Sequence, residues 1–302
     1  MASRDRKYLH YGTAIKKCRD TPEILEMILA QMDMRTLLTS AQRVSRSWFN
    51  LISTSPSIQK ALFFTPIKDS EWGIGAKILN PLLTETFVSL FPAKGKSYSC
   101  CFDICDLPMA KDALIMTRFA RKDASWRKML VQQPPVSGIG LFPLLSSRGH
   151  HGVNCYSIPA DQKMQESGHN GLRMERLFEV LLLTRFTSPH VYWSPGKSIE
   201  FDRSNSQVIK DAFDLQLSKS GLVLCTETAM PCDVVPSPRR PPSAAQIIRE
   251  KIIAAFREQG LDADLKRKCI RESQVGGDFV GSIDVLVEYG ACTPPPPRRT
   301  VR

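Results

Sequence analysis

The sequence predicts an α+β protein: a small all-α helical unit, a mixed domain of a few strands and helices, then a C-terminal helix and a disordered tail. Apolar residues between 21 and 64 change phase at intervals too short for one helix. Proline-rich sequence at 236–242 ends the middle region. The expected division is a basic tail at 1–19, the helical unit at 20–64, the α+β domain at 65–235, a proline linker with an amphipathic helix at 236–290, and a disordered basic tail at 291–302.

The N-terminal unit is predicted to contain three or four short helices. Thr21 is placed to cap the first, with Pro22 at the first helical position, where a missing N–H costs nothing. Asp33 ends that pattern and begins another, and Ser55 and Pro56 repeat the signature of a cap followed by proline. The apolar stripes are Ile24, Met27, Ile28 and Met32, then Met34, Leu37, Leu38 and Ala41, then Val44, Trp48, Leu51 and Ile52, and finally Ile58 and Leu62.

The middle region is predicted to place its helices on one side of a sheet of a few strands. Asn80 and Pro81 open a short helix or turn after a connector. Periodicity does not decide between a strand and a helix turn at 112–116. The remaining expectations for its first half are a strand at 98–104, a helix at 124–131 that the following prolines end, and a loop at 146–152.

The second half of the middle region is predicted to begin with a helix at 172–184 and a strand at 190–193. Residues 215–217 and 222–225 are expected to pair as a hairpin around a glycine turn. After the proline linker, Ser243 is placed to cap an amphipathic helix that ends at Gly260. That helix is expected to dock on the middle domain or on a partner.

The N-terminal stripes combine with a proline at the start of the first helix and a tryptophan in the third, and this combination resembles an F-box. The matching residues are Pro22, Ile24 and 26–29 in the first helix, Leu37 and Leu38 in the second, and Val44, Arg46 and Trp48 in the third. Patches within 80–91, 125–135 and 171–174 are similar to segments found in a group of fungal F-box proteins.

The resemblance implies a non-catalytic substrate-receptor subunit of an SCF-type, cullin-RING ubiquitin ligase. The F-box would dock a Skp-type adaptor, and through it the cullin and RING subunits, while residues 80–235 receive a substrate protein or rigidify the receptor. The alternatives are an F-box protein that binds the adaptor without a role in a ligase, and a scaffold that binds nothing through this segment. The residues implied to contact the adaptor are Pro22, Ile24, Ile28, Leu37, Leu38, Val44 and Trp48.

The net charge of +11 lies mostly in the flanks of the chain. Residues 1–19 carry six Lys or Arg against one acid and residues 239–302 carry twelve against eight, whereas residues 20–64 balance at four against four. This distribution is typical of solvated tails. A helix-turn-helix protein is the nucleic-acid alternative, but the third helix offers only Arg43 and Arg46 to phosphates, so nucleic acid is disfavoured as a partner.

Cysteine usage and the N-terminal sequence predict a protein of the cytoplasm or nucleus. The nine cysteines form an odd set without an apolar signal core, which predicts reduced thiols. No apolar run approaches the roughly eighteen residues that a membrane helix needs, so no membrane partner is expected. Cys100, Cys101 and Cys105 lack the spacing of a zinc knuckle, and no metal is expected.

The sequence contains no pattern that supports catalysis, so neither an enzyme nor a cofactor is expected. The glycines at 138–140 and 149–152 lack the spacing and the lysine of a phosphate loop. No serine lies in a nucleophile elbow. His150 and His151 fall in a predicted loop, and the aromatic residues fit a packed core.

Overall fold

The computed structural model describes the greater part of the chain and has the predicted α+β fold. Within these residues, no helix combines the length and the apolar content that crossing a membrane requires. The tails expected at 1–19 and 291–302 lie outside the description. The described residues are 21–67, 77–92, 99–147, 150–153, 155–160, 171–183, 189–194, 207–229 and 241–261.

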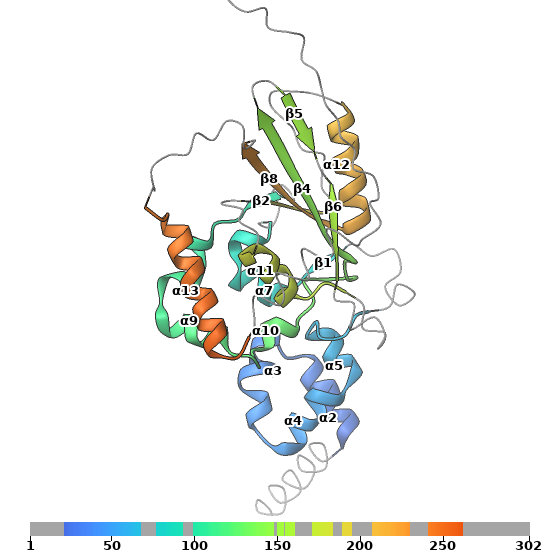
Figure 1. Cartoon of the computed structure of the whole chain (residues 1–302). Helices are drawn as coiled ribbons and strands as arrows, with labels where there is room; N and C mark the ends of the chain where they lie inside the picture. The colour runs from blue at the N-terminus through green and yellow to red at the C-terminus, as the bar shows by residue number, and fades with distance from the viewer. Residues whose placement is uncertain are drawn as a thin grey trace, which may run out of the picture.

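The N-terminal unit is a cluster of short helices at one end of the molecule (Figure 1). Pro22 begins the first helix as predicted, but the Thr21 side chain makes no capping hydrogen bond. Asp33, Ser45 and Ser55 each accept a hydrogen bond from a backbone N–H three residues later and so cap the helices that follow them. The elements are α2 (Pro22–Ala30), α3 (Met34–Thr39), the 3-10 turn η1 (Ala41–Arg43), α4 (Arg46–Thr54) and α5 (Pro56–Ala61).

The N-terminal unit has a hydrophobic core of its own. One or two residues from each helical element are fully buried in it, which is how a unit of this size removes apolar surface from water. The buried residues are Leu25, Leu29, Leu37, Ala41, Ile52, Ile58 and Leu62.

A mixed sheet forms the centre of the second part of the chain, in the strand order β2-β7-β8-β4-β5, with β6 paired to β4. β4 and β8 run parallel, with Leu141 opposite Leu224, and the other neighbours are antiparallel. The strands are β2 (Ser99–Cys101), β4 (Gly138–Ser147), β5 (His150–Val153), β6 (Tyr156–Pro159), β7 (His190–Trp193) and β8 (Leu222–Ala229).

Helices cover both faces of this sheet, and the prediction that they lie on one side is wrong. Helix α12 (Gln207–Ser220) packs Phe213 against Phe142 of β4 and Val223 of β8. On the opposite face, α11 (Met174–Leu183) packs with the inward residues of β4, β7 and β8 in a larger core. Alternate residues of a strand point to opposite faces, so β4 contributes to both cores.

A second group of elements extends this larger core away from the sheet. The two short strands β1 and β3 pair with Leu79 opposite Gln132. Helices α9 and α13 lie side by side (Figure 1), and α13 docks on the domain through Ile252 and Phe256. The elements are β1 (Ile78–Leu79), α7 (Pro81–Thr86), η2 (Val88–Leu90), η3 (Ile104–Asp106), α8 (Pro108–Lys111), α9 (Ala113–Ala120), α10 (Ser125–Lys128), β3 (Gln132–Gln133) and α13 (Ala244–Glu258).

Several elements of the middle region differ from their prediction. The expected hairpin strand at 215–217 belongs to the C-terminal half of α12, because Ile209, Phe213 and Leu217 complete a helical stripe against the sheet. The expected loop at 146–152 contains the end of β4 and most of β5, which pair with each other. The strand expected at 98–104 is reduced to β2, and the helix expected at 124–131 to the single turn of α10.

Candidate functional site

Exposed apolar side chains gather on the N-terminal unit. Ten large apolar residues are exposed among the described residues, and five of them lie between residues 24 and 49. Single exposed apolar residues are ordinary on a protein surface, whereas a group on one small unit indicates a contact surface. We call this group, together with exposed Pro22, the docking face; its other members are Ile24, Met27, Ile28, Val44 and Phe49, which are between 39% and 71% exposed.

Helix α2 contributes most of the docking face because it is apolar on two sides. Leu25 and Leu29 point into the core of the unit and are almost completely buried. Ile24, Met27 and Ile28 occupy the remaining positions at i, i+3 and i+4, which are neighbours on a helix surface. The helix therefore holds the unit together with one side and presents an apolar stripe on the other.

The third helical region adds Val44 and Phe49 to the docking face. Val44 lies between η1 and α4 and is exposed, while Trp48 is half-buried and packs against the core of the unit. Phe49 follows Trp48 on α4 and is half exposed. The predicted apolar stripe of this helix contains Trp48 and Ile52 but leaves out Phe49. A large apolar side chain beside the stripe is the signal that identifies Phe49.

Of the seven residues implied to contact the adaptor, Leu37 is buried, and Leu38 and Trp48 are half-buried against the core of the unit. Leu37 is 1% exposed and belongs to the core of the unit. Leu38 is half-buried and packs against both this core and the larger core of the α+β domain. The structure thus separates these two leucines from Pro22, Ile24, Ile28 and Val44, because α3 is covered by its neighbours on the side that carries them. Met27 and Phe49 are surface residues outside the set implied to contact the adaptor.

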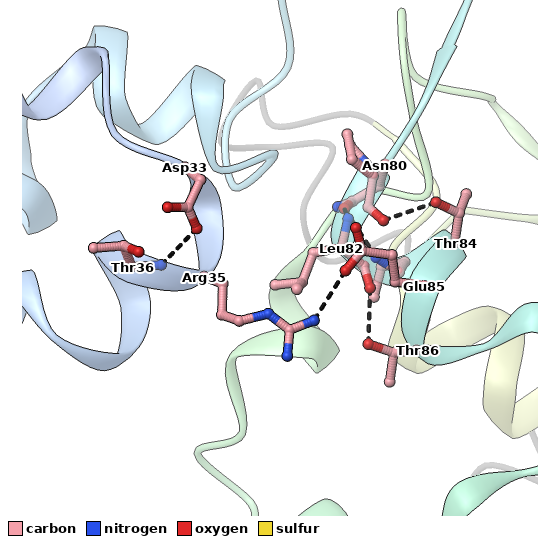
Figure 2. Close-up of polar contacts among 10 residues, drawn as sticks. Asp33, Arg35, Thr36, Asn80, Leu82, Thr84, Glu85 and Thr86 are labelled. Atoms are coloured by element: carbon pink, nitrogen blue, oxygen red, sulfur yellow. Dashed lines mark hydrogen bonds and ion pairs between the residues drawn. The ribbon is translucent and has the colours of Figure 1, made fainter.

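Helix α3 also contacts the α+β domain through an ion pair. Figure 2 shows Arg35 of α3 extending toward Glu85 of α7. The distance between Arg35 Nη2 and Glu85 Oε2 is 2.9 Å, and both side chains are about two-thirds exposed. Asp33 and Asn80 cap the two helices involved. An exposed pair of this kind contributes at most about 1 kcal/mol, so it orients the helices more than it stabilises them.

The segment after α5, residues 63–67, is bonded directly to the α+β domain, and we call it the junction. The carbonyl oxygen of Phe63 accepts a hydrogen bond from the N–H of Leu130 at 2.7 Å, and that of Phe64 accepts one from Arg173 Nη1 at 3.2 Å. Phe63 has a φ of 60°. A buried non-glycine residue in this left-handed conformation is strained and persists only where its surroundings fix it.

A single side-chain amide fixes the rest of the junction. Gln133 Nε2 donates a hydrogen bond to the carbonyl oxygen of Thr65 at 3.0 Å, and Gln133 Oε1 accepts one from the N–H of Ile67, also at 3.0 Å. Gln133 is 1% exposed. Its amide therefore pairs with the backbone of the junction as a neighbouring strand would.

A shallow hollow borders the docking face at the start of α4. It is lined by Gln42, Arg43, Ser45, Arg46, Phe49 and Asn50. Val44, a member of the docking face, lies between two of these lining residues in the sequence. The hollow thus combines one aromatic ring, two guanidinium groups and three neutral polar side chains.

Possible metal ligands and thiols are the chemically reactive side chains that can be assessed among the described residues. They contain no group of three or more His, Cys, Asp or Glu placed to hold a metal ion. Burial raises the pKa of Cys100 to about 12 and that of Cys155 to about 11, so both thiols are protonated at neutral pH. Cys225 is buried in β8, as its apolar sequence context predicts.

In comparisons with known proteins, the sequence matches no family model, no curated protein and no solved structure at a significant level. The F-box resemblance therefore stands on the residues quoted for it. The candidate function follows from those residues and from the surface on which the structure places them.

Proposed function

We propose that this chain is a non-catalytic substrate-receptor subunit of an SCF-type ubiquitin ligase. Residues 20–64 dock a Skp-type adaptor, the α+β domain carries the surface for a substrate protein, and the chemistry of ubiquitin transfer belongs to partner subunits. The expected partners are the adaptor and, through it, the cullin and RING subunits.

The observation that carries the proposal is the docking face on a unit whose own core is already filled. Ile24, Met27 and Ile28 are exposed although Leu25 and Leu29 of the same helix are buried. Exposed apolar side chains cost solvation free energy that a partner recovers on binding, at about 25 cal/mol for each Å² covered. A partner with an apolar groove for α2 is therefore the best match to this surface.

The junction supports the second half of the proposal. A receptor has to hold its substrate in a defined position relative to the adaptor. The hydrogen bonds of Gln133 and Leu130 with the junction, together with the packing of Leu38 between both cores, attach the N-terminal unit to the α+β domain at several points. Such an attachment suits a rigid receptor.

The test is direct binding between the purified full-length chain and a purified Skp-type adaptor, measured by calorimetry. Ile24→Asp combined with Ile28→Asp should weaken binding by about a hundredfold or more, because each carboxylate is buried in an apolar contact. The matched control is Leu114→Asp combined with Leu215→Asp, on α9 and α12, since these leucines are 62% and 48% exposed outside the docking face. The control should bind as the unchanged chain does.

Three outcomes contradict the proposal at different levels. If the folded, unchanged chain does not bind the adaptor, the proposed function is wrong. If the variant in α2 binds normally, the docking face is misplaced. If the tagged chain copurifies from cells with adaptor but never with cullin, the chain is an adaptor-binding scaffold without a ligase role.

A further inference from the structure

The hollow at the start of α4 carries positive charge that the described residues leave uncompensated. The guanidinium groups of Arg43 and Arg46 form no hydrogen bond or ion pair with any residue in the described ranges, and both side chains are exposed. Among the residues that the structure describes, no carboxylate lines the hollow. Two neighbouring arginines on one wall of a concave surface favour a negatively charged ligand.

The carboxylates of the same unit are committed or placed elsewhere. Asp33 caps α3 by accepting a hydrogen bond from the N–H of Thr36 at 2.9 Å. Glu26 accepts hydrogen bonds from Ser55 and Ser57 at the α2–α5 contact. Arg35, the other arginine of the unit, is already paired with Glu85. The unit therefore has as many acidic as basic residues, but its carboxylates lie away from Arg43 and Arg46. The positive charge of these two arginines is concentrated in the hollow.

The hollow also shares one residue with the apolar docking face. Phe49 belongs to both, and Val44 lies between Arg43 and Ser45. A ligand in the hollow therefore meets an aromatic ring beside the two guanidinium groups. That combination fits a protein segment with a carboxylate next to an apolar anchor better than it fits a nucleic-acid backbone, which needs more cations along its length.

We propose that the hollow receives an acidic segment of the adaptor, with Arg43 and Arg46 pairing to its Asp or Glu carboxylates while an adjacent apolar side chain packs on Phe49. This proposal rests on the proposed function, because it names the chemistry of the same partner. The apolar stripe of α2 supplies most of the binding free energy. The hollow fixes the register of the adaptor on the unit and accelerates the encounter.

The first test measures adaptor binding to the full-length chain at about 50 mM and about 500 mM salt, a range over which the Debye length falls severalfold. Arg43→Gln with Arg46→Gln should weaken binding about fivefold to tenfold at low salt and change it little at high salt. Arg43→Glu with Arg46→Glu should weaken binding further, mainly through a slower association rate. The control is Arg118→Gln with Lys122→Gln, at exposed positions in and after α9.

The second test identifies the acidic segment. Carbodiimide joins an amine to a carboxylate in contact with it but does not join a guanidinium group. The variant Arg46→Lys should therefore form one additional cross-link to an Asp or Glu of the adaptor, and mass spectrometry of the peptides identifies it. The unchanged chain should lack this cross-link.

The outcomes separate this proposal from the proposed function. If the adaptor binds, but with the same affinity and salt dependence in both arginine variants, the acidic-segment proposal is overturned and the proposed function stands. If the unchanged chain does not bind the adaptor at either salt concentration, both are overturned. If a labelled duplex or single-stranded oligonucleotide binds and the Gln variants lose it, the hollow is a phosphate site and the acidic-segment proposal is wrong.

Discussion

At the scale of single residues, Trp126 and Arg127 connect the elements of the larger core. The Trp126 ring contacts the rings of Phe87, Phe119 and Phe178 at centroid distances of 5.4 to 6.1 Å. Arg127 is 2% exposed and pairs with Glu175 of α11 at 3.0 Å. The single turn of α10 thus buries two large side chains. Its contribution to the packing of the larger core comes from these side chains rather than from the length of the helix.

The guanidinium of Arg127 also holds the C-terminal helix. It lies 4.9 Å from the centre of the Trp126 ring and 4.5 Å from that of Phe256 on α13. Burial lowers the pKa of Arg127, while Glu175 opposes this shift. A buried cation held between two aromatic rings and a carboxylate gives α13 a specific docking position, in addition to the apolar contact that its sequence predicts.

Replacing Trp126 tests this cluster. We expect Trp126→Ala to lower the free energy of unfolding by roughly 3–5 kcal/mol, because the small side chain leaves a cavity among three aromatic rings. Trp126→Phe keeps a ring but loses the hydrogen bond from Nε1 to the carbonyl oxygen of Phe119, and we expect a smaller loss. Urea unfolding followed by circular dichroism measures both. Equal losses for the two variants would mean that the ring contributes little.

At the scale of elements, the contact between α2 and α5 depends on one carboxylate. Glu26 Oε1 accepts hydrogen bonds from Ser55 Oγ and Ser57 Oγ, both at 2.5 Å. Ser55 is itself the cap of α5 and accepts a hydrogen bond from the N–H of Ile58. The helix that carries the docking face is therefore tied to the start of α5. The hydrogen bonds from Ser55 and then Ser57 lower the pKa of Glu26 below its usual value of 4.5.

This pKa shift predicts an acid-sensitive contact. Because the folded state lowers the pKa, Glu26 stabilises the fold above pH 4.5, and that contribution disappears as the pH falls through the lower, folded-state pKa. Between about pH 5 and about pH 3, the stability of Glu26→Gln should therefore decline less than that of the unchanged chain. Thermal melting across this range measures the difference.

The control for this experiment is Glu23→Gln on the same helix. Glu23 is exposed and accepts no hydrogen bond from a side chain within the described residues. Its variant should keep the acid sensitivity of the unchanged chain. If the two variants lose the same share of the pH dependence, the contact between α2 and α5 is not its source.

At the scale of the whole molecule, the junction decides whether the two parts of the chain move as one body. Its backbone is bonded to Gln133 and Leu130, and the left-handed Phe63 turns the chain from α5 toward the domain. Leu38 and Phe64 pack against both hydrophobic cores. The N-terminal unit has its own core, but these contacts fix its orientation on the domain.

Replacing Gln133 tests the coupling. In Gln133→Ala, the amide of Ile67 loses its acceptor, and we expect its hydrogen exchange to accelerate by about tenfold or more. The amide of Leu25 should stay protected, because it donates to the carbonyl oxygen of Thr21 at the start of α2 and not to the junction. The matched control is Gln132→Ala, since Gln132 is equally buried but its amide donates to Pro134 and not to the junction. Equal acceleration of exchange at Ile67 in both variants would indicate a general destabilisation of the domain rather than the loss of the hydrogen bond between Ile67 and Gln133.

The elements that the sequence predicts correctly are those whose signals lie within the element itself, such as a capping residue or an apolar periodicity. Asp33, Ser55 and Ser243 begin helices because their side chains accept hydrogen bonds from nearby backbone N–H groups. The strand at 190–193 and the helix that ends at Leu183 follow from residue type and periodicity. In α2, by contrast, the predicted stripe residues Ile24, Met27 and Ile28 are exposed, and the core-facing residues are Leu25 and Leu29, which that stripe did not include.

The remaining features depend on contacts between residues far apart in the sequence. Residues 215–217 have strand-like alternation, yet they continue α12, because the sheet beneath it offers Phe142 and Val223 to a helical stripe. Leu37 and Leu38 carry as much of the F-box pattern as Ile24, but the packing of α3 against two cores buries Leu37 and half-buries Leu38.

The sequence by itself determined the α+β class, the helix caps at Asp33, Ser55 and Ser243, and the apolar content of the docking face, because these depend on residues within one or two turns of each other. The tertiary structure alone decided which apolar residues remain exposed, the placement of helices on both faces of the sheet, and the junction bonds of Gln133. Burial is a property of neighbours in space, and a periodic pattern states that a face is apolar without stating what covers it.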